Sequence, residues 1–287
     1  MTSGPNCSAD SSAGRNEPIV KPQKTKVTEQ EYVLGTNRDE LVRLGLQHQL
    51  WAAPAADAWE RAGFGPGKKL LDVGCGPGYA TLDLAARVGT QGRVLAIDIS
   101  KRFISHLQSQ IRARGLTRIT AALGHVERLT LPKAAFDGAY ARWVLCFVEN
   151  PDAVVSGVAR ALKKGGAFVI QDYLNYEGVL IGPNCEVFRR FFKMVAQSWR
   201  RRGGNPDIGA EIPDILARHG FEVREIKPLL RVARPGSPLW KWPETFFENY
   251  LPVLAELACS ANRTKTNSIG NGAGGPGIRR RSLSRRR

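Results

Sequence analysis

Hydrophobic positions in the middle of the chain follow two alternating patterns. Short apolar runs, typical of buried strands, cover residues 69–73, 93–97, 118–123, 136–144 and 167–171. The stretches between them place apolar residues every three or four positions, as amphipathic helices do, over 77–88, after Ser100 and after Asn150. Ser100 and the pair Asn150-Pro151 are also good helix starts. The alternation predicts an α/β fold with a Rossmann-like, doubly wound and mostly parallel sheet.

The flanking segments are predicted to cover this sheet. Residues 31–256 are interpreted as one domain, made of cap helices at 31–64, a core at 68–176 and 206–230, and a lid insertion at 177–205. In the lid, Phe188, Phe191, Phe192, Val195 and Trp199 have helical spacing. Within the second part of the core, a helix is expected at 208–218 and a sixth strand at 221–227.

Both ends of the chain lack any apolar period. Residues 1–30 and 257–287 are therefore predicted to be disordered tails. The chain carries a formal charge of +16, and eight basic residues with no acidic residue lie from Arg263 onward. A basic tail can bind phosphates without reading sequence, so nucleic acid is expected as a partner only through this tail.

Composition excludes several other classes. The five cysteines are scattered without a C-x-x-C pair, and the four histidines are dispersed, so neither a disulfide framework nor a metal site is predicted. No run approaches the roughly eighteen apolar residues that a membrane span requires, and no secretory signal is visible. A cytoplasmic location without a membrane span is predicted.

The strongest local signal is the turn that follows the first strand, Leu70-Leu71-Asp72-Val73-Gly74-Cys75-Gly76-Pro77-Gly78. A strand that ends in glycines and opens a helix lets the backbone approach a bound ligand closely. Asp98 ends the second strand, where a carboxylate accepts hydrogen bonds from both ribose hydroxyls of an adenosine. Together, the turn and Asp98 predict an adenosine-type cofactor.

Two residues favour S-adenosylmethionine (SAM) over a nicotinamide dinucleotide. Tyr79 stands at the third glycine position of the dinucleotide pattern, where it would crowd a pyrophosphate. Asp72 adds a carboxylate at the turn, which suits an ammonium group and opposes a diphosphate. SAM has an α-amino group, a sulfonium and no phosphate, so SAM is the predicted cofactor.

The same residues resemble class I SAM-dependent methyltransferases of the ubiquinone/menaquinone and other small-molecule type. Residues 70–78 resemble the first motif of that family, 94–100 the second, 136–145 the fourth-strand motif and 162–166 the turn before strand five. The four motifs occur in the family's order and spacing within residues 40–227. The family's sheet usually closes with an antiparallel seventh strand, and only 229–233 offers a candidate for it.

The resemblance implies a set of cofactor-binding residues. Asp72, Gly74, Cys75 and Gly76 would line the methionine end of SAM, and Asp98 would hold the ribose with Ile99 against the adenine. His125 stands where many relatives place an aspartate, so the adenine contact is expected to involve His125 and the Val126 backbone. Arg142 would face the cofactor or the substrate mouth. The full set is Asp72, Gly74, Cys75, Gly76, Asp98, Ile99, His125, Val126 and Arg142.

Two residues are candidate general bases, needed only if the methyl acceptor must lose a proton. Asp172 ends the fifth strand beside the expected pocket, although it is equally suited to cap the following turn. His48 lies on the N-terminal helices, where a surface role is the plainer reading. Trp143, Tyr173 and Tyr176 are candidates for an aromatic substrate wall.

The leading interpretation is a SAM-dependent methyltransferase that acts by in-line displacement on an O, N or C atom of a small molecule. Three alternatives remain open: an RNA or protein methyltransferase that docks through the basic tail, a nicotinamide-dependent oxidoreductase, and a SAM-binding protein without catalysis. Against the first, Ala141-Arg142-Trp143-Val144 stands where an N-P-P-Y-type motif would follow strand four. The oligomeric state is not predicted.

Overall fold

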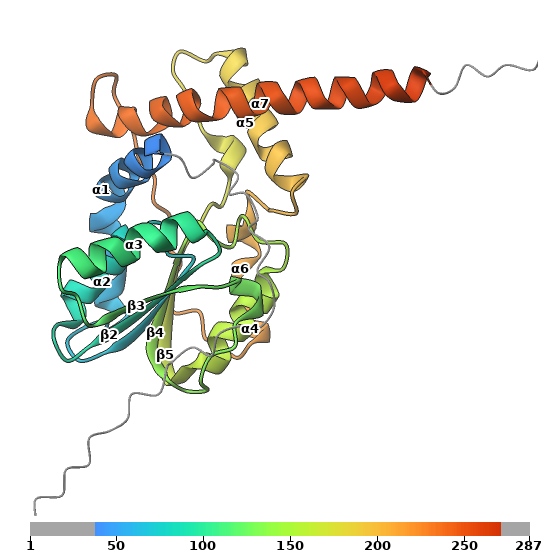
Figure 1. Ribbon diagram of the computed structural model, residues 1–287. Helices are drawn as coiled ribbons and strands as arrows, with labels where there is room; N and C mark the ends of the chain where they lie inside the picture. The colour runs from blue at the N-terminus through green and yellow to red at the C-terminus, as the bar shows by residue number, and fades with distance from the viewer. Residues whose placement is uncertain (1–37, 271–287) are drawn as a thin grey trace, which may run out of the picture.

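The computed structural model describes residues 38–270, and a five-stranded sheet lies at its centre (Figure 1). All strands are parallel, in the order β3-β2-β1-β4-β5. Their bounds are β1 (Lys69–Val73), β2 (Arg93–Asp98), β3 (Ile119–Leu123), β4 (Phe136–Arg142) and β5 (Leu162–Gln171). The predicted strands are confirmed, and the order reverses between β1 and β4, where open α/β sheets bind their ligands.

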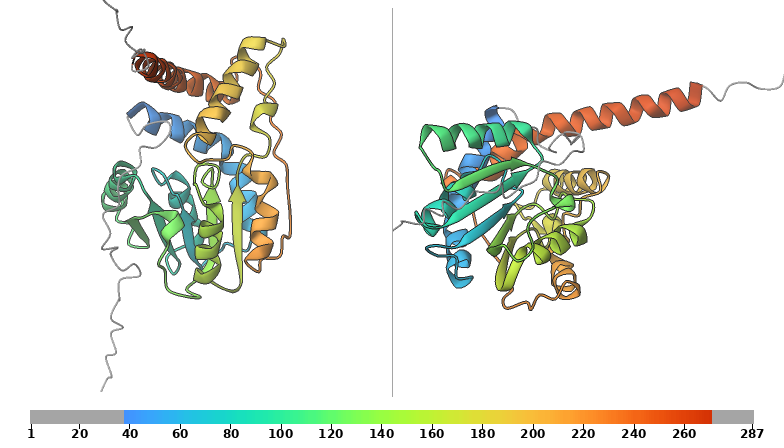
Figure 2. Two further views of the ribbon diagram at one scale, coloured as in Figure 1. Left: turned by 90° about the vertical axis from the view of Figure 1, so that its right-hand side faces the viewer. Right: turned by 60° about the horizontal axis from the view of Figure 1, so that its bottom comes forward.

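Helices cover both faces of the sheet, as the doubly wound prediction requires (Figure 2). On one face lie α1 (Arg38–Arg61), α2 (Tyr79–Val88) and α3 (Lys101–Ala113), with Trp59 and Leu84 packed against Leu70 and Tyr140. On the other lie α4 (Pro151–Ala161) and α6 (Ile212–Arg218). A strand that is buried on both faces has a continuous apolar sequence. The strands could therefore be predicted from their apolar runs.

The two predicted helix starts are confirmed. The Ser100 hydroxyl accepts a hydrogen bond from the Phe103 N–H at 3.3 Å, and the Asn150 side chain accepts one from the Ala153 N–H at 2.9 Å. Each bond satisfies an N–H group that the first helical turn leaves without a partner. Both caps follow a parallel strand, so they also set where each helix begins its return across the sheet.

Above the carboxyl ends of the strands, α5 (Glu186–Arg200) and α7 (Pro238–Gly270) cross near the start of α1 (Figure 1). Here this part of the molecule, α1, α5 and α7, is named the cap. Buried aromatic residues of α5 and α7 pack with Tyr176 of the short helix η2 (Tyr176–Gly178). The helix predicted in the lid insertion is thereby confirmed. Two further short helices are η1 (Val126–Arg128) and η3 (Ile208–Ala210).

The C-terminal part of the prediction needs correction. Residues 221–227 form no strand, and neither do 229–233. Side-chain contacts to α1 hold this segment instead: Arg61 donates to Glu225 at 2.8 Å, and Lys227 donates to Asp57 at 2.9 Å. Pro228 lacks the N–H that a sheet ladder needs. The sheet therefore ends at β5, which begins at Leu162 and includes the glycines expected to form a turn.

Helix α7 continues to Gly270, past residue 257, where a disordered tail was expected to begin. The predictions for residues 1–30 and for the last part of the basic tail lie outside the described residues. Among residues 38–270, no helix combines the length and apolar character needed to cross a membrane.

Candidate functional site

A cavity of about 330 Å³ opens at the carboxyl ends of β1, β2 and β4, within the size range of small-molecule sites. All nine residues predicted to bind the cofactor line it, although they come from four separate stretches of the chain. The remaining lining residues are Leu44, Gln47, Pro77, Tyr79, Ala80, Phe103, Glu127, Tyr140, Trp143, Val144, Phe147, Val148, Glu149 and Arg202.

The turn after β1 brings bare backbone to the cavity wall. Gly74 and Gly76 have φ angles of +65° and +55°, in the left-handed region that side chains disfavour. A Cβ at Gly74 would come within 2.5 Å of Val144 Cγ2, whereas a Cβ at Gly76 would meet no atom within 4 Å. The first glycine is thus required by packing against the loop after β4, and the second leaves open space for a ligand.

Asp98 at the end of β2 is anchored toward this turn. One carboxylate oxygen accepts the Gly76 N–H and the other accepts the Ser100 N–H, both at 2.8 Å. Burial raises the pKa of Asp98, and the backbone donors partly offset that rise. The carboxylate is therefore oriented by the motif itself and lies in the cavity wall, where ribose hydroxyls would find acceptors.

Asp72 is only 2% exposed and lies at the floor of the cavity. Its carboxylate accepts a hydrogen bond from the Thr81 hydroxyl at 2.6 Å. Burial raises its pKa to about 6, while the Thr81 bond and the positive charge of Arg142 lower it. A buried carboxylate with this incomplete compensation gains from a cationic ligand, because opposite charge favours the ionised form.

Arg142 ends β4 and supplies the cavity with a cation close to Asp72. Its Nη2 donates to His48 Nδ1 at 3.0 Å, and its guanidinium lies over the Trp143 ring at 5.2 Å. Its Nη1 is buried and has no hydrogen-bond partner among the described residues. Buried donors are almost always satisfied, so this atom indicates a ligand acceptor.

The side of the cavity that is predicted to hold the adenine is formed by Ile99, Phe103 and the stretch His125–Val126 before and within η1. His125 Nδ1 lies 3.2 Å from a Glu127 carboxylate oxygen, and the other Glu127 oxygen accepts the Asn150 N–H at 2.6 Å. This chain of contacts joins the loop after β3 to the start of α4. The Glu127–Asn150 bond therefore fixes the stretch that carries His125 at the cavity wall, which the sequence pattern did not reveal.

Neither candidate general base lines the cavity. The Asp172 carboxylate accepts the backbone N–H groups of Leu145, Cys146 and Tyr173 at 3.0, 3.3 and 3.0 Å. These bonds tie the end of β5 to the loop after β4, and burial raises the pKa of Asp172 to about 6. His48 contacts Arg142 behind the wall. In this structure both side chains contact residues that form the wall, and the general-base role stays a prediction.

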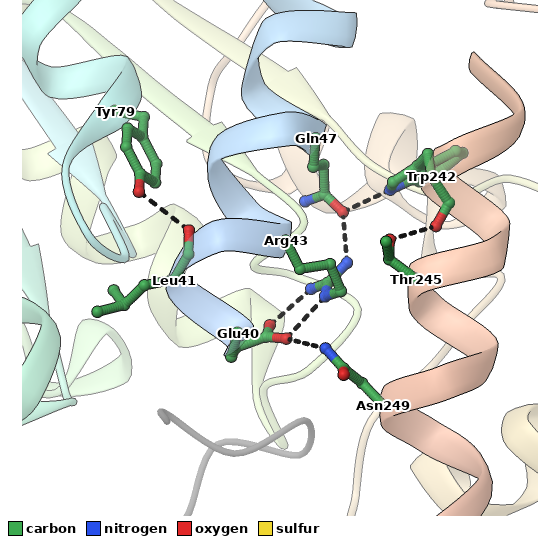
Figure 3. Close-up of polar contacts among 8 residues, drawn as sticks. All are labelled: Glu40, Leu41, Arg43, Gln47, Tyr79, Trp242, Thr245 and Asn249. Carbon is green, nitrogen blue, oxygen red and sulfur yellow. Dashed lines mark hydrogen bonds and ion pairs between the residues drawn. The ribbon is translucent and has the colours of Figure 1, made fainter. Parts of the chain in front are cut away.

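Sequence reasoning missed the contribution of α1. Leu44 and Gln47 line the cavity, and the Tyr79 hydroxyl donates to the Leu41 carbonyl at 2.9 Å, which joins α1 to α2. Figure 3 shows how Gln47 is held from two sides: its Oε1 accepts Arg43 Nη1 at 3.0 Å and Trp242 Nε1 at 2.7 Å. Polar residues such as Arg43 and Gln47 within this predicted helix were the sequence feature that could have indicated the contribution of α1.

The same close-up shows a buried ion pair in the cap (Figure 3). Arg43 donates from Nε and Nη2 to the two oxygens of Glu40, at 2.7 and 2.6 Å, and Asn249 Nδ2 lies 3.4 Å from Glu40. Burial raises the pKa of Glu40, and the Arg43 bonds oppose that rise. Both partners belong to α1, so the bidentate geometry orients the Glu40 carboxylate within that helix, and the Asn249 contact joins it to α7.

The outer end of the cavity, where the loop after β4 meets the end of α5, combines apolar and aromatic side chains with two charged ones. Trp143, Phe147 and Val148 line it together with Glu149 and Arg202. Trp143 has a φ of +51°, unusual for a bulky residue, and its ring stacks with Tyr173 and with Trp242 at centroid distances of 6.0 Å each. Tyr173 and Tyr176 support this wall from behind, so Trp143 alone of the three predicted wall residues lines the cavity.

The residues fit the cofactor predicted from the sequence. The bare backbone at Gly76, the ribose acceptor Asp98 and the anion Asp72 suit an adenosine with a cationic side group, and Arg142 Nη1 suits a carboxylate. In the described part of the chain, no group of three or more histidine, cysteine, aspartate or glutamate side chains is arranged to hold a metal ion.

Comparison with known proteins agrees with the geometry. A family model described as a methyltransferase domain matches residues 71–170. The chain is 32% identical over 190 residues to a demethylmenaquinone methyltransferase from Geobacillus stearothermophilus, covering 60% of this chain and 78% of that protein. A demethylmenaquinone methyltransferase from Symbiobacterium thermophilum is 33% identical over 128 residues, covering 42% of this chain and 51% of that protein.

A solved structure of a SAM-dependent methyltransferase from Aquifex aeolicus is 20% identical, with a TM-score of 0.46 and coverage of 59% of this chain and 80% of that one. The chain spans about half the length of several curated relatives that it matches.

Proposed function

Because this chain belongs to the class I methyltransferases, whose cofactor is SAM, we propose that it transfers the methyl group of SAM to a small-molecule acceptor. One observation carries the proposal: the glycine turn, Asp98, Asp72 and Arg142 line a single cavity. Neither an RNA or protein acceptor nor a nicotinamide cofactor is favoured, because the relatives named above are methyltransferases of a small molecule.

Four contacts would hold SAM. Asp98 would accept both ribose hydroxyls, and Ile99 with His125 and Val126 would enclose the adenine. Asp72 would attract the ammonium group, and its ionised form would be favoured by that positive charge. Arg142 would bind the carboxylate through its Nη1 atom, for which the described residues provide no hydrogen-bond acceptor. Gly74, Cys75 and Gly76 would pass beneath the methionine end.

When bound, SAM supplies a methyl carbon activated by its sulfonium. The chain's own contribution is to hold the acceptor atom in line with that carbon and to exclude water, which is worth roughly 7–11 kcal/mol in well-oriented reactions. Trp143, Phe147 and Val148 provide the dry wall for this purpose. Neither Asp172 nor His48 is assigned as general base, because the acceptor sites of both are already occupied by protein donors.

An apolar, flat acceptor suits the outer end of the cavity. Its wall is aromatic, and the curated relatives are named for demethylmenaquinone, a molecule with an aromatic ring system. Glu149 lies at the same end and packs beside Gly203, where an added Cβ would come within 2.5 Å of Glu149 Cγ. Glu149 is therefore the carboxylate best placed to contact a polar group of the acceptor.

Calorimetric titration of the purified chain with SAM, S-adenosylhomocysteine (SAH) and NAD tests the proposal. We expect binding of SAM and SAH, none of NAD, and a loss of about 100-fold or more in Asp98→Ala, because a charge-assisted ribose contact is removed. Asp214→Ala, an exposed aspartate on α6, is the matched control and should bind as the parent does. Binding of NAD instead of SAM would refute the proposal.

A further inference from the structure

His48 lies behind the cavity wall in a contact chain that leads to Arg142. Its Nε2 is 2.9 Å from an Asp83 oxygen, and its Nδ1 is 3.0 Å from Arg142 Nη2. The three residues come from α1, α2 and the end of β4. Their side chains therefore connect three elements that are far apart in the sequence and adjacent in the fold.

The chemistry of arginine assigns the proton on His48. A guanidinium has five N–H donors and no acceptor, so Arg142 can only donate to Nδ1. Nδ1 must then carry a lone pair, and the ring proton lies on Nε2, where Asp83 accepts it. Asp83 thus selects the tautomer that Arg142 requires, as carboxylates do for metal-binding histidines.

The ring itself is held in a defined plane. It stacks on Tyr79 with a centroid distance of 6.0 Å and an interplanar angle of 20°. The His48 side chain is 10% exposed, whereas the Asp83 side chain is 49% exposed. The contact chain therefore runs from a solvated carboxylate, through a fixed imidazole, to a guanidinium in the cavity wall.

One consequence concerns the remaining donors of Arg142. Nη2 is committed to His48, and the face of the guanidinium is occupied by Trp143. Without the His48 bond, the guanidinium could turn toward Asp72, because the two side chains already attract each other electrostatically. With the bond, Nη1 stays available as a buried donor in the cavity wall.

We infer that His48, fixed by Asp83, is a positioning residue that aims Arg142 at the carboxylate of the methionine end of SAM. The inference rests on the proposed function, because it assumes that the cavity binds SAM. It separates the two charges of the amino-acid group: the carboxylate goes to Arg142, and the ammonium goes to Asp72. His48 contacts no substrate and acts only through Arg142.

A truncated ligand tests this role. SAH and its decarboxylated analogue, which keeps the amine and lacks the carboxylate, are titrated calorimetrically against the parent chain and His48→Phe. Phenylalanine keeps the flat ring beside Tyr79 and removes both nitrogens. We expect His48→Phe to weaken SAH by about tenfold, in the range known for residues that orient a ligand-binding group, and the analogue by less than twofold.

The chain contains a matched control pair. His219 Nε2 lies 2.9 Å from Asp152, the same distance as in the His48–Asp83 pair, but both residues lie outside the cavity lining. His219→Phe should leave the affinities for both ligands unchanged. Arg142→Met should weaken SAH most, and adding His48→Phe to it should cause no further loss, because residues that act in series are not additive.

A second variant protects the test against misfolding of His48→Phe. Asp83→Ala changes a half-exposed side chain and leaves His48 in place, and a loss of about threefold for SAH alone is expected from the lost orientation. Equal losses for SAH and the analogue, or no loss in either variant, would overturn the inference while leaving the proposed function intact. A parent chain that binds neither ligand would overturn both.

Discussion

The two ends of the cavity depend on contacts of different sequence separation. At the glycine turn, the contacting residues lie close together in the chain, whereas in the cap they lie about two hundred residues apart. Gly76 N–H meets Asp98 over a separation of 22 residues. Trp242 meets Gln47 over 195 residues, and Asn249 meets Glu40 over 209. A local sequence motif thus determines one end of the site, whereas the other end depends on how helices that are distant in the chain pack together.

The two ends also differ in what a ligand would find there. The turn end presents backbone and fixed carboxylates, which suit one unchanging cofactor. The other end presents Trp143 and Phe147 of the loop after β4, which aromatic residues of the cap support, and such a wall suits an acceptor that differs between proteins. Function carried on a rigid scaffold commonly divides in this way, with variable segments setting specificity. Four variants can break or sharpen this contrast.

The largest effect is expected from Trp199→Ala in the cap. Trp199 is 2% exposed and contacts Phe147, Tyr176 and Tyr250. Removing the indole should lower the free energy of unfolding by about 4 kcal/mol, measured by urea denaturation. Trp199→Phe should cost less. SAH affinity of the folded variant should stay within about twofold, and a parallel collapse of affinity would show that the two ends are not separable.

At the turn end, Gly74→Ala should act with a single methyl group. The residue has a φ of +65°, and the new Cβ would lie 2.5 Å from Val144 Cγ2. Strain and overpacking together should lower the free energy of unfolding by about 3 kcal/mol and SAH affinity by more than about tenfold. Gly63→Ala, with a φ of +71° and no atom within 4 Å, carries the strain alone and should not affect SAH.

Asp72→Asn separates stability from binding through pH. The pKa of Asp72 is about 6 in the folded chain, against an ordinary value of 3.8, so between these two pH values the folded state binds more protons than the unfolded state. The free energy of unfolding therefore falls as pH rises from about 4 to 6. At pH 7, Asp72→Asn should be more stable than the parent by about 2 kcal/mol, with no advantage at pH 4.

The same substitution should weaken SAM, which needs the ionised carboxylate. Affinity of the parent for SAM should rise between pH 5 and 7, and this rise should disappear in Asp72→Asn. Calorimetry at three pH values measures the binding, and urea denaturation at the same values measures stability. An Asp72→Asn variant that is less stable than the parent at pH 7 would show that burial is not the main influence on the pKa of Asp72.

The smallest effect is expected from Trp242→Phe, which removes the 2.7 Å bond to Gln47 Oε1. The free energy of unfolding should fall by about 1 kcal/mol, and hydrogen exchange of α1 and α7 amides should accelerate, with SAH affinity unchanged. Trp240→Phe on the same helix is the control. Slower exchange, or a change in SAH affinity larger than in Trp199→Ala, would contradict the division between the two ends.

Prediction from the sequence succeeded where neighbours in the chain define the structure. Ser100 and Asn150 cap their helices as expected, and Asp98 lies beside the glycine turn because parallel strands end at one edge of a sheet. It failed at 221–227, where an apolar alternation typical of a strand is held to α1 by side chains instead. The period of apolar residues indicates which side chains pack against another element, but it does not identify that element.

The candidate site divides in the same manner. The glycine turn and its acidic partners followed from residue type and spacing alone, since a left-handed turn admits little besides glycine and a strand end fixes where a carboxylate lies. For Asp172 the sequence left capping and catalysis open, and it did not predict the contacts of His48, because a side chain's function depends on the groups that occupy its lone pairs. Asp172 meets three backbone N–H groups, and His48 meets Arg142, from segments far away in the chain.

The sequence by itself determined the parallel core, its helix starts and the cofactor end, since local backbone preference and apolar period act over a few residues. Only the tertiary structure decided that α1 supplies Gln47, that Trp143 rather than Tyr173 or Tyr176 lines the cavity, and that Arg142 Nη1 has no hydrogen-bond partner within residues 38–270. Such contacts between distant segments arise from the packing of whole helices, and no single stretch of residues encodes them.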